Sequence, residues 1–147
     1  MLNKKHIIIL LMILAIYPVY WISIVIHELG HYIAFYVSGG YVVDFVVTWY
    51  NGHTLGYAPT DTIVFVHLLG GVFQAFFFVL LSERLKTKYL FAPAVFCLTY
   101  AIFEAMQITF AQIISAYFVL FAYLIVATGI VINKSLDILY EDEIDER

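Results

Sequence analysis

Four long apolar stretches dominate the sequence and restrict the chain to folds that cross a membrane. The hydrocarbon core of a bilayer is about 30 Å thick and requires roughly 20 helical residues. Hydrophobic residues make up 64% of the 147 residues and charged residues only 12%, which leaves too little polar surface for a soluble domain. We therefore predict an all-α membrane protein with about four transmembrane helices, at positions 7–37, 61–81, 89–107 and 112–132. Residues 1–134 then form a single membrane domain, and residues 135–147 form an acidic cytoplasmic tail.

The basic residues predict how this protein lies in the membrane. With four spans, all seven Lys and Arg residues fall on one side, which the positive-inside rule assigns to the cytoplasm. Both termini of this multi-pass protein are then cytoplasmic. The first stretch of 31 residues would form a helix about 46 Å long, so we expect it to tilt or to kink at Pro18. No small-x-small cleavage pattern follows its N-terminal half, so we interpret it as an uncleaved anchor.

The segment between the first two spans has the composition of a β-hairpin. Positions 42–50 are rich in Val, Phe, Trp and Tyr, which favour strands, and Asn51-Gly52 is a strong turn signal. We expect a short hairpin that packs at the membrane surface or dips into it, with its backbone groups paired. His53 is expected to cap its turn.

The first span contains an HExxH motif, His27-Glu28-Leu29-Gly30-His31. Histidines at positions i and i+4 lie on the same helix face, so both imidazoles can reach one metal ion. Glu28 lies about 100° around the helix, where it can contact a water that the metal activates and act as the catalytic base. Ionisable residues inside a membrane span are costly and usually functional, and no Lys or Arg lies within a span to neutralise Glu28. A divalent cation would provide that neutralisation. In a non-catalytic interpretation, the histidines only hydrogen-bond neighbouring helices.

A catalytic zinc site requires a third protein ligand. Glu104 is the only other acid well inside an apolar stretch, and counting residues from the helix ends places it in the same half of the membrane as His27. Gln107, one turn further on, is expected to share its face and is a candidate for binding substrate. The alternative ligands are His67 in the second span, Asp61, which also suits a helix N-cap, and Asp44 on the hairpin; His6 is expected at the interface.

These residues together resemble the site-2 protease family of intramembrane zinc metalloproteases. The resemblance rests on His27–His31 in a transmembrane helix, on the β-prone segment after it, and on Gly70-Gly71-Val72-Phe73-Gln74. The last string is similar to the family's Gly-Pro-x-x-Asn, and the resemblance implies that Gln74 holds the substrate backbone. It also implies Zn²⁺ on two histidines and an aspartate from a later Asp-Gly motif. That motif is absent here, and Glu104 would replace the aspartate.

The leading functional hypothesis is an intramembrane zinc metalloprotease that hydrolyses a peptide bond in or near a transmembrane segment. Its partners would be a membrane-protein or peptide substrate and the lipid bilayer, without nucleic acid. A second copy or another chain could complete the pocket, or a groove of this chain alone could do so. The alternative is a non-catalytic membrane module that uses a structural metal site as an adaptor for a partner; a closed fourth ligand position, for example at His67, would favour it. Transport of a metal is a weaker third hypothesis.

Overall fold

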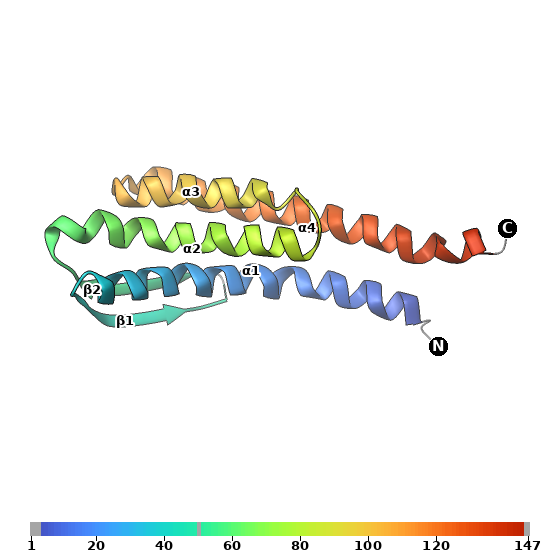
Figure 1. Cartoon of the computed structure of the whole chain (residues 1–147), viewed down its shortest axis with the longest axis horizontal. Helices are drawn as coiled ribbons and strands as arrows, with labels where there is room; N and C mark the ends of the chain where they lie inside the picture. Colours follow the sequence, from blue (N-terminus) through green and yellow to red (C-terminus); the bar gives the residue numbers. More distant parts are fainter. Residues whose placement is uncertain (1–3, 50, 146–147) are drawn as a thin grey trace.

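The computed structural model describes residues 4–49 and 51–145, and it confirms an all-α membrane fold with one small hairpin. Long antiparallel helices run along the molecule, with the hairpin inserted after the first (Figure 1). In chain order, the elements are α1 (Lys4–Val37), β1 (Tyr41–Val47), β2 (Gly52–Tyr57), one 3₁₀ turn (Thr60–Thr62), α2 (Ile63–Arg84), α3 (Phe91–Ala105) and α4 (Thr109–Asp145).

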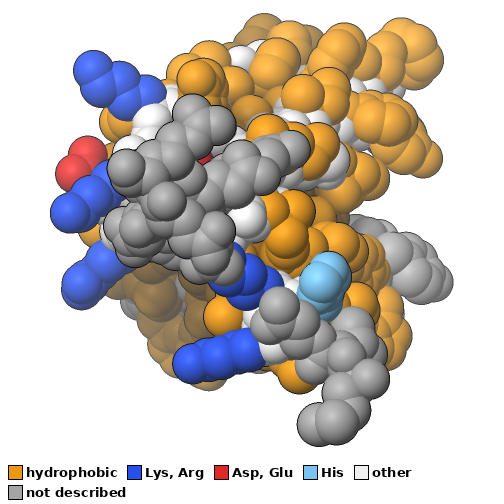
Figure 2. Space-filling view, turned by 90° about the vertical axis from the view of Figure 1, so that its right-hand side faces the viewer, with side chains coloured by type: hydrophobic (Ala, Val, Ile, Leu, Met, Phe, Trp, Pro, Cys, Tyr) orange, Lys and Arg blue, Asp and Glu red, His pale blue; other side chains and the backbone are white. Residues whose placement is uncertain are grey.

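The helices have the length and the surface of membrane spans. Among the described residues, three segments are long and apolar enough to cross a bilayer, namely α1, Thr60–Arg84 and Phe110–Leu139. Helix α3 has 15 residues, which is about 22 Å, so the third predicted span is shorter than the bilayer core. Large hydrophobic side chains are exposed on all four helices, and they also surround the basic side chains at the end seen in Figure 2, as contact with lipid requires.

Two helices run further than hydropathy alone suggests. Helix α1 is continuous through Pro18 over 34 residues, so the proline does not divide the first stretch into two elements. Helix α4 continues through the predicted acidic tail as far as Asp145. The start of α1, the end of α2 and the second half of α4 lie toward the same end of the molecule, where the described basic side chains gather (Figures 1 and 2). The basic residues that the structure describes therefore lie toward one end of the helices, as the prediction that they share one side requires.

The hairpin folds back along α1 instead of projecting away from it. Strand β1 pairs with β2 in antiparallel register from Tyr41–Tyr57 to Val47–Gly52, with a bulge after Val42. Near the turn, Trp21 Nε1 donates to the backbone oxygen of Thr48 at 2.9 Å. The Tyr17 hydroxyl donates to the backbone oxygen of Trp49. The hairpin therefore runs beside the apolar helix over about five helical turns.

The turn itself is closed by residues other than the predicted one. Thr48 Oγ1 donates to the backbone oxygen of Asn51 at 2.8 Å, and Asn51 Oδ1 accepts from the backbone N–H of Gly52 at 2.8 Å. His53 does not cap the turn, which corrects that prediction. It lies in β2, and its Nε2 pairs across the sheet with Asp44 Oδ2 at 3.2 Å.

Candidate metal centre

Two histidines and a glutamate meet between α1 and α3. His27 and His31 are successive on one face of α1 and are about 5% exposed. His27 Nε2 lies 2.9 Å from His31 Nε2. From α3, Glu104 brings Oε2 to 3.6 Å from His27 Nε2 and Oε1 to 3.3 Å from His31 Nε2. The structure thus brings together the three residues that the sequence predicts as metal ligands. This cluster could hold a metal ion.

The donor atoms fit such an ion. Tetrahedral ligand atoms about 2.1 Å from a zinc ion lie about 3.4 Å from one another. The distances from the two Glu104 oxygens, 3.6 and 3.3 Å, are close to this value, whereas the two histidine Nε2 atoms, 2.9 Å apart, would have to separate by about 0.5 Å. His31 Nδ1 lies 2.8 Å from the backbone oxygen of Val66, an arrangement that holds the proton on Nδ1 and leaves Nε2 free to bind a metal. Glu104 Oε2 is buried and has no hydrogen-bond partner within the described part of the chain. Burying a carboxylate oxygen in this way is costly unless a cation compensates for it.

Two glycines bring α1 and α2 close enough to support the site. A Cβ on Gly30 would lie 2.6 Å from the backbone oxygen of Leu69, so only glycine permits this helix approach. A Cβ on Gly70 would fall on the imidazole of His31, 2.5 Å from Cε1 and 2.8 Å from Cδ2. Gly70 therefore leaves the space that the His31 ring occupies. Small residues at such crossings are typical of membrane helix packing.

Glu28 points toward the hairpin. Its side chain is buried, and Thr54 Oγ1 donates to Glu28 Oε2 at 2.9 Å. The same Thr54 oxygen lies 3.2 Å from the backbone oxygen of Glu28. Gly52 packs so closely that a Cβ there would lie 2.6 Å from Glu28 Cγ. Strand β2 thus fixes the position of the predicted base beside the metal ligand His27.

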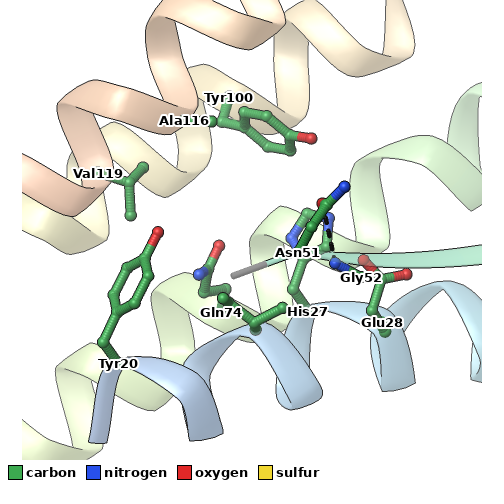
Figure 3. A pocket seen from close by; sticks show the side chains of 10 residues that line it. Tyr20, His27, Glu28, Asn51, Gly52, Gln74, Tyr100, Ala116 and Val119 are labelled. Atoms are coloured by element: carbon green, nitrogen blue, oxygen red, sulfur yellow. Dashed lines mark hydrogen bonds between the residues drawn. The ribbon is translucent and has the colours of Figure 1, made fainter. Parts of the chain in front are cut away.

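Two small cavities adjoin these groups. One, of about 240 Å³, is lined by the metal cluster, Glu28, Thr54 and His67. The other, of about 100 Å³, is shown in Figure 3, where Gln74 of α2 lies between Tyr20 and His27. His27, Glu28 and Tyr100 line both. At about 30 Å³ for each water, the cavities have room for several water molecules next to the base.

The two predicted substrate-binding glutamines have different positions. Gln74 is buried and lines the smaller cavity, where its Nε2 donates to Ser23 Oγ at 3.1 Å. Gln107 does not share the helical face of Glu104, which corrects that prediction. Helix α3 ends at Ala105, and Gln107 has a left-handed φ of 55° and is exposed. Gln112 instead contacts the end of α3 through the backbone oxygen of Phe103, at 3.2 Å.

The alternative ligands lie outside the three-residue cluster. The His67 ring is close, with its centroid 6.4 Å from that of His31, and it lines the larger cavity. Asp61 lies in the 3₁₀ turn that directly precedes α2. The N-cap residue of α2 is Thr62, which makes no side-chain capping hydrogen bond, so the prediction that Asp61 is the N-cap is wrong. Asp44 pairs with His53 on the hairpin, and His6 is exposed near the start of α1.

The sequence did not predict three contacts at the site. Gly52 was expected only in the turn and Thr54 was not singled out, and both contact Glu28 because the hairpin folds back. Gly70 was part of the string that resembles the protease family, but its contact with His31 was not expected. The available signals were a threonine and a glycine among apolar strand residues and a pair of glycines in an apolar helix. These signals are typical of turns and helix packing as well, so alone they do not identify a site.

No family model matches the chain, and neither does a curated protein or a solved structure.

Proposed function

We propose that the chain is an intramembrane zinc metallopeptidase that hydrolyses a peptide bond in or near a membrane-spanning segment. One observation carries this proposal: a cluster of two buried histidines, His27 and His31, and the half-buried Glu104 lies beside a buried carboxylate, Glu28, that takes no part in the cluster. A structural metal site needs ligands only. An additional acid, held separately and facing the same cavity, is what hydrolysis requires.

Imidazole and carboxylate donors suit zinc, and we assign His27, His31 and Glu104 as its ligands. A zinc ion bound there would supply Lewis acidity, which makes a water more acidic and polarises a carbonyl. A three-ligand set leaves a position open for that chemistry. His67 lies outside the cluster, which favours an open position over a closed one.

Glu28 would act as the catalytic base. Its carboxylate would take a proton from the attacking water as the water oxygen bonds to the scissile carbonyl carbon. The same proton would then pass to the amide nitrogen as the C–N bond breaks, so that an acid and an amine leave. Thr54 holds one carboxylate oxygen, which leaves the other for the water. Gln74 is the nearest candidate to contact the substrate backbone, because its amide lines the cavity next to His27.

The hairpin would present the substrate in an extended form. Peptide carbonyls in a helix are already hydrogen-bonded, so the scissile segment has to unwind before attack. Each strand of a two-stranded sheet has one free edge, and an extended peptide can pair with such an edge. Because the hairpin lies beside α1 at the depth of Glu28, a paired peptide would be held next to the base.

The test begins with zinc content, measured by elemental analysis of the full chain in detergent. We expect near-stoichiometric zinc in the wild type, and loss of zinc in His31→Ala and in Glu104→Ala. Glu28→Gln should retain zinc. Lys88→Gln, an exposed change on the α2–α3 loop, is the matched control. Absence of zinc in the wild type after zinc is added back would overturn the metal assignment.

Activity is then measured with a library of apolar peptides in micelles, with products detected by mass spectrometry. The wild type should cleave and Glu28→Gln should not, although both carry zinc. Equal cleavage by both would refute the role of Glu28. A wild type that carries zinc and cleaves nothing would favour the alternative, an adaptor with a structural metal site.

A further inference from the structure

A groove with a basic mouth lies at the end of the molecule far from the metal centre. It measures about 770 Å³ and is bounded by the α2–α3 loop and by α4. Arg84, Lys86 and Lys134 line it together with apolar residues such as Ile125 and Ile130. The loop is fixed from within, because the buried Ser82 hydroxyl donates to the backbone oxygen of Thr87.

Gly129 leaves the apolar part of this groove open. It lines the groove on α4, and a Cβ there would meet no atom within 4 Å. A second groove of about 390 Å³ lies between α1 and α4 and is lined almost entirely by apolar side chains, among them Ile16 and Val19. Leu85, Ile130 and Lys134 line both grooves. The two grooves therefore adjoin at these three residues, of which Lys134 carries the charge.

The charge around the meeting point is mainly positive. Figure 2 shows the basic side chains gathered on this end of the molecule. Lys134 Nζ lies 3.5 Å from Asp137 Oδ2, but both side chains are more than half exposed, so this ion pair is weak and can exchange partners. Glu83, in the last turn of α2, is exposed and does not line either groove.

We propose that these grooves bind one anionic glycerophospholipid, with its phosphate at Arg84, Lys86 and Lys134 and an acyl chain in each hollow. Basic pockets between helix ends are suited to anionic lipid headgroups. The second, apolar groove distinguishes a two-chain lipid from a soluble anion or an acidic peptide, neither of which would fill it. The site lies apart from the metal cluster and is independent of the proposed peptidase activity.

Native mass spectrometry of the full chain tests this proposal, with phosphatidylglycerol and phosphatidylcholine of identical acyl chains added at equal concentration. We expect retention of one phosphatidylglycerol per chain, preferred by at least about tenfold at low salt. Equal retention of both lipids would overturn the headgroup assignment. Displacement of the lipid by millimolar inorganic phosphate would indicate an anion site instead of a lipid site.

Two kinds of variant separate the charged part from the apolar part. The triple variant Arg84→Gln/Lys86→Gln/Lys134→Gln should lose the preference for phosphatidylglycerol, whereas Lys88→Gln, on the same loop but outside the groove, should keep it. Gly129→Leu should reduce retention of both lipids while zinc content stays at the wild-type value. A loss of preference in Lys88→Gln as large as in the triple variant would show that only the general charge of this end matters, and would refute the site.

Discussion

Replacing Gly70 by alanine would test whether the metal centre depends on the close packing of α1 against α2. The new Cβ would lie 2.5 Å from Cε1 and 2.8 Å from Cδ2 of His31, whereas ordinary contacts begin at 3.4 Å. The Cβ would lie closer still to Nε2, the atom proposed to bind the metal, so the ring would have to retreat by about 0.9 Å or more. Metal–ligand distances tolerate only about 0.2 Å, so His31 could no longer bind together with His27 and Glu104.

The expected result is a loss of zinc affinity of at least 10- to 100-fold, because even changes to groups that only orient a ligand cost that much. Titration against a zinc-buffering chelator, in detergent, measures the affinity directly. Gly129→Ala is the matched control, since its Cβ meets no atom within 4 Å. It should bind zinc as the wild type does.

A double variant shows whether the effect passes through His31. If Gly70→Ala acts by displacing that ring, Gly70→Ala/His31→Ala should bind zinc no more weakly than His31→Ala alone. A further loss in the double variant would mean that the alanine separates the helices. Zinc affinity within twofold of wild type in Gly70→Ala would show that the metal centre does not depend on the close packing of α1 against α2.

Three other changes test neighbouring contacts. Thr54→Val removes the hydrogen bond to Glu28 and should lower peptide hydrolysis by about tenfold, with zinc content unchanged. Thr54→Ser keeps the hydroxyl and should hydrolyse peptides at the wild-type rate. A fall in zinc content in Thr54→Val would contradict a positioning role. Glu104→Gln keeps the shape of the side chain but removes its charge, so elemental analysis should find little zinc; full occupancy would exclude Glu104 as a ligand. Gly30→Ala should lower the free energy of unfolding by about 1–3 kcal/mol through overpacking, measured by denaturation in mixed micelles against Gly129→Ala, and an unchanged value would show that the helix crossing can relax.

The apolar helices and the grouping of His27, His31 and Glu104 follow from the sequence because each depends on short-range regularities, although α3 is shorter than the span predicted there. A run of about 20 apolar residues is enough to identify a membrane-spanning helix. The spacing of His27 and His31 places both on one face of such a helix. Glu104 could be chosen because helical rise converts sequence position into depth. None of these steps requires knowledge of how the helices pack.

The contacts that surround Glu28 could not be predicted, because they depend on the direction in which the hairpin turns. Strand preference and Asn51-Gly52 predict a hairpin, but whether it points away from α1 or along it is decided by contacts such as that of Trp21 with Thr48. The prediction that Gln107 shares the helical face of Glu104 is wrong for a related reason. It assumes that the helix continues past Ala105, where the chain has already entered a left-handed turn.

The metal ligands also have a mechanical consequence, because they come from helices whose backbones do not pack directly. Among the described residues, α2 packs against both α1 and α3, whereas α1 and α3 share no close backbone contact. The link between them at the site runs through the long side chains of His27, His31 and Glu104. Helices in lipid gain little from the hydrophobic effect and are held by close packing and polar contacts. An ion shared by these three side chains would therefore join α1 directly to α3, so that the arrangement that positions the site and the ion that it holds would stabilise each other.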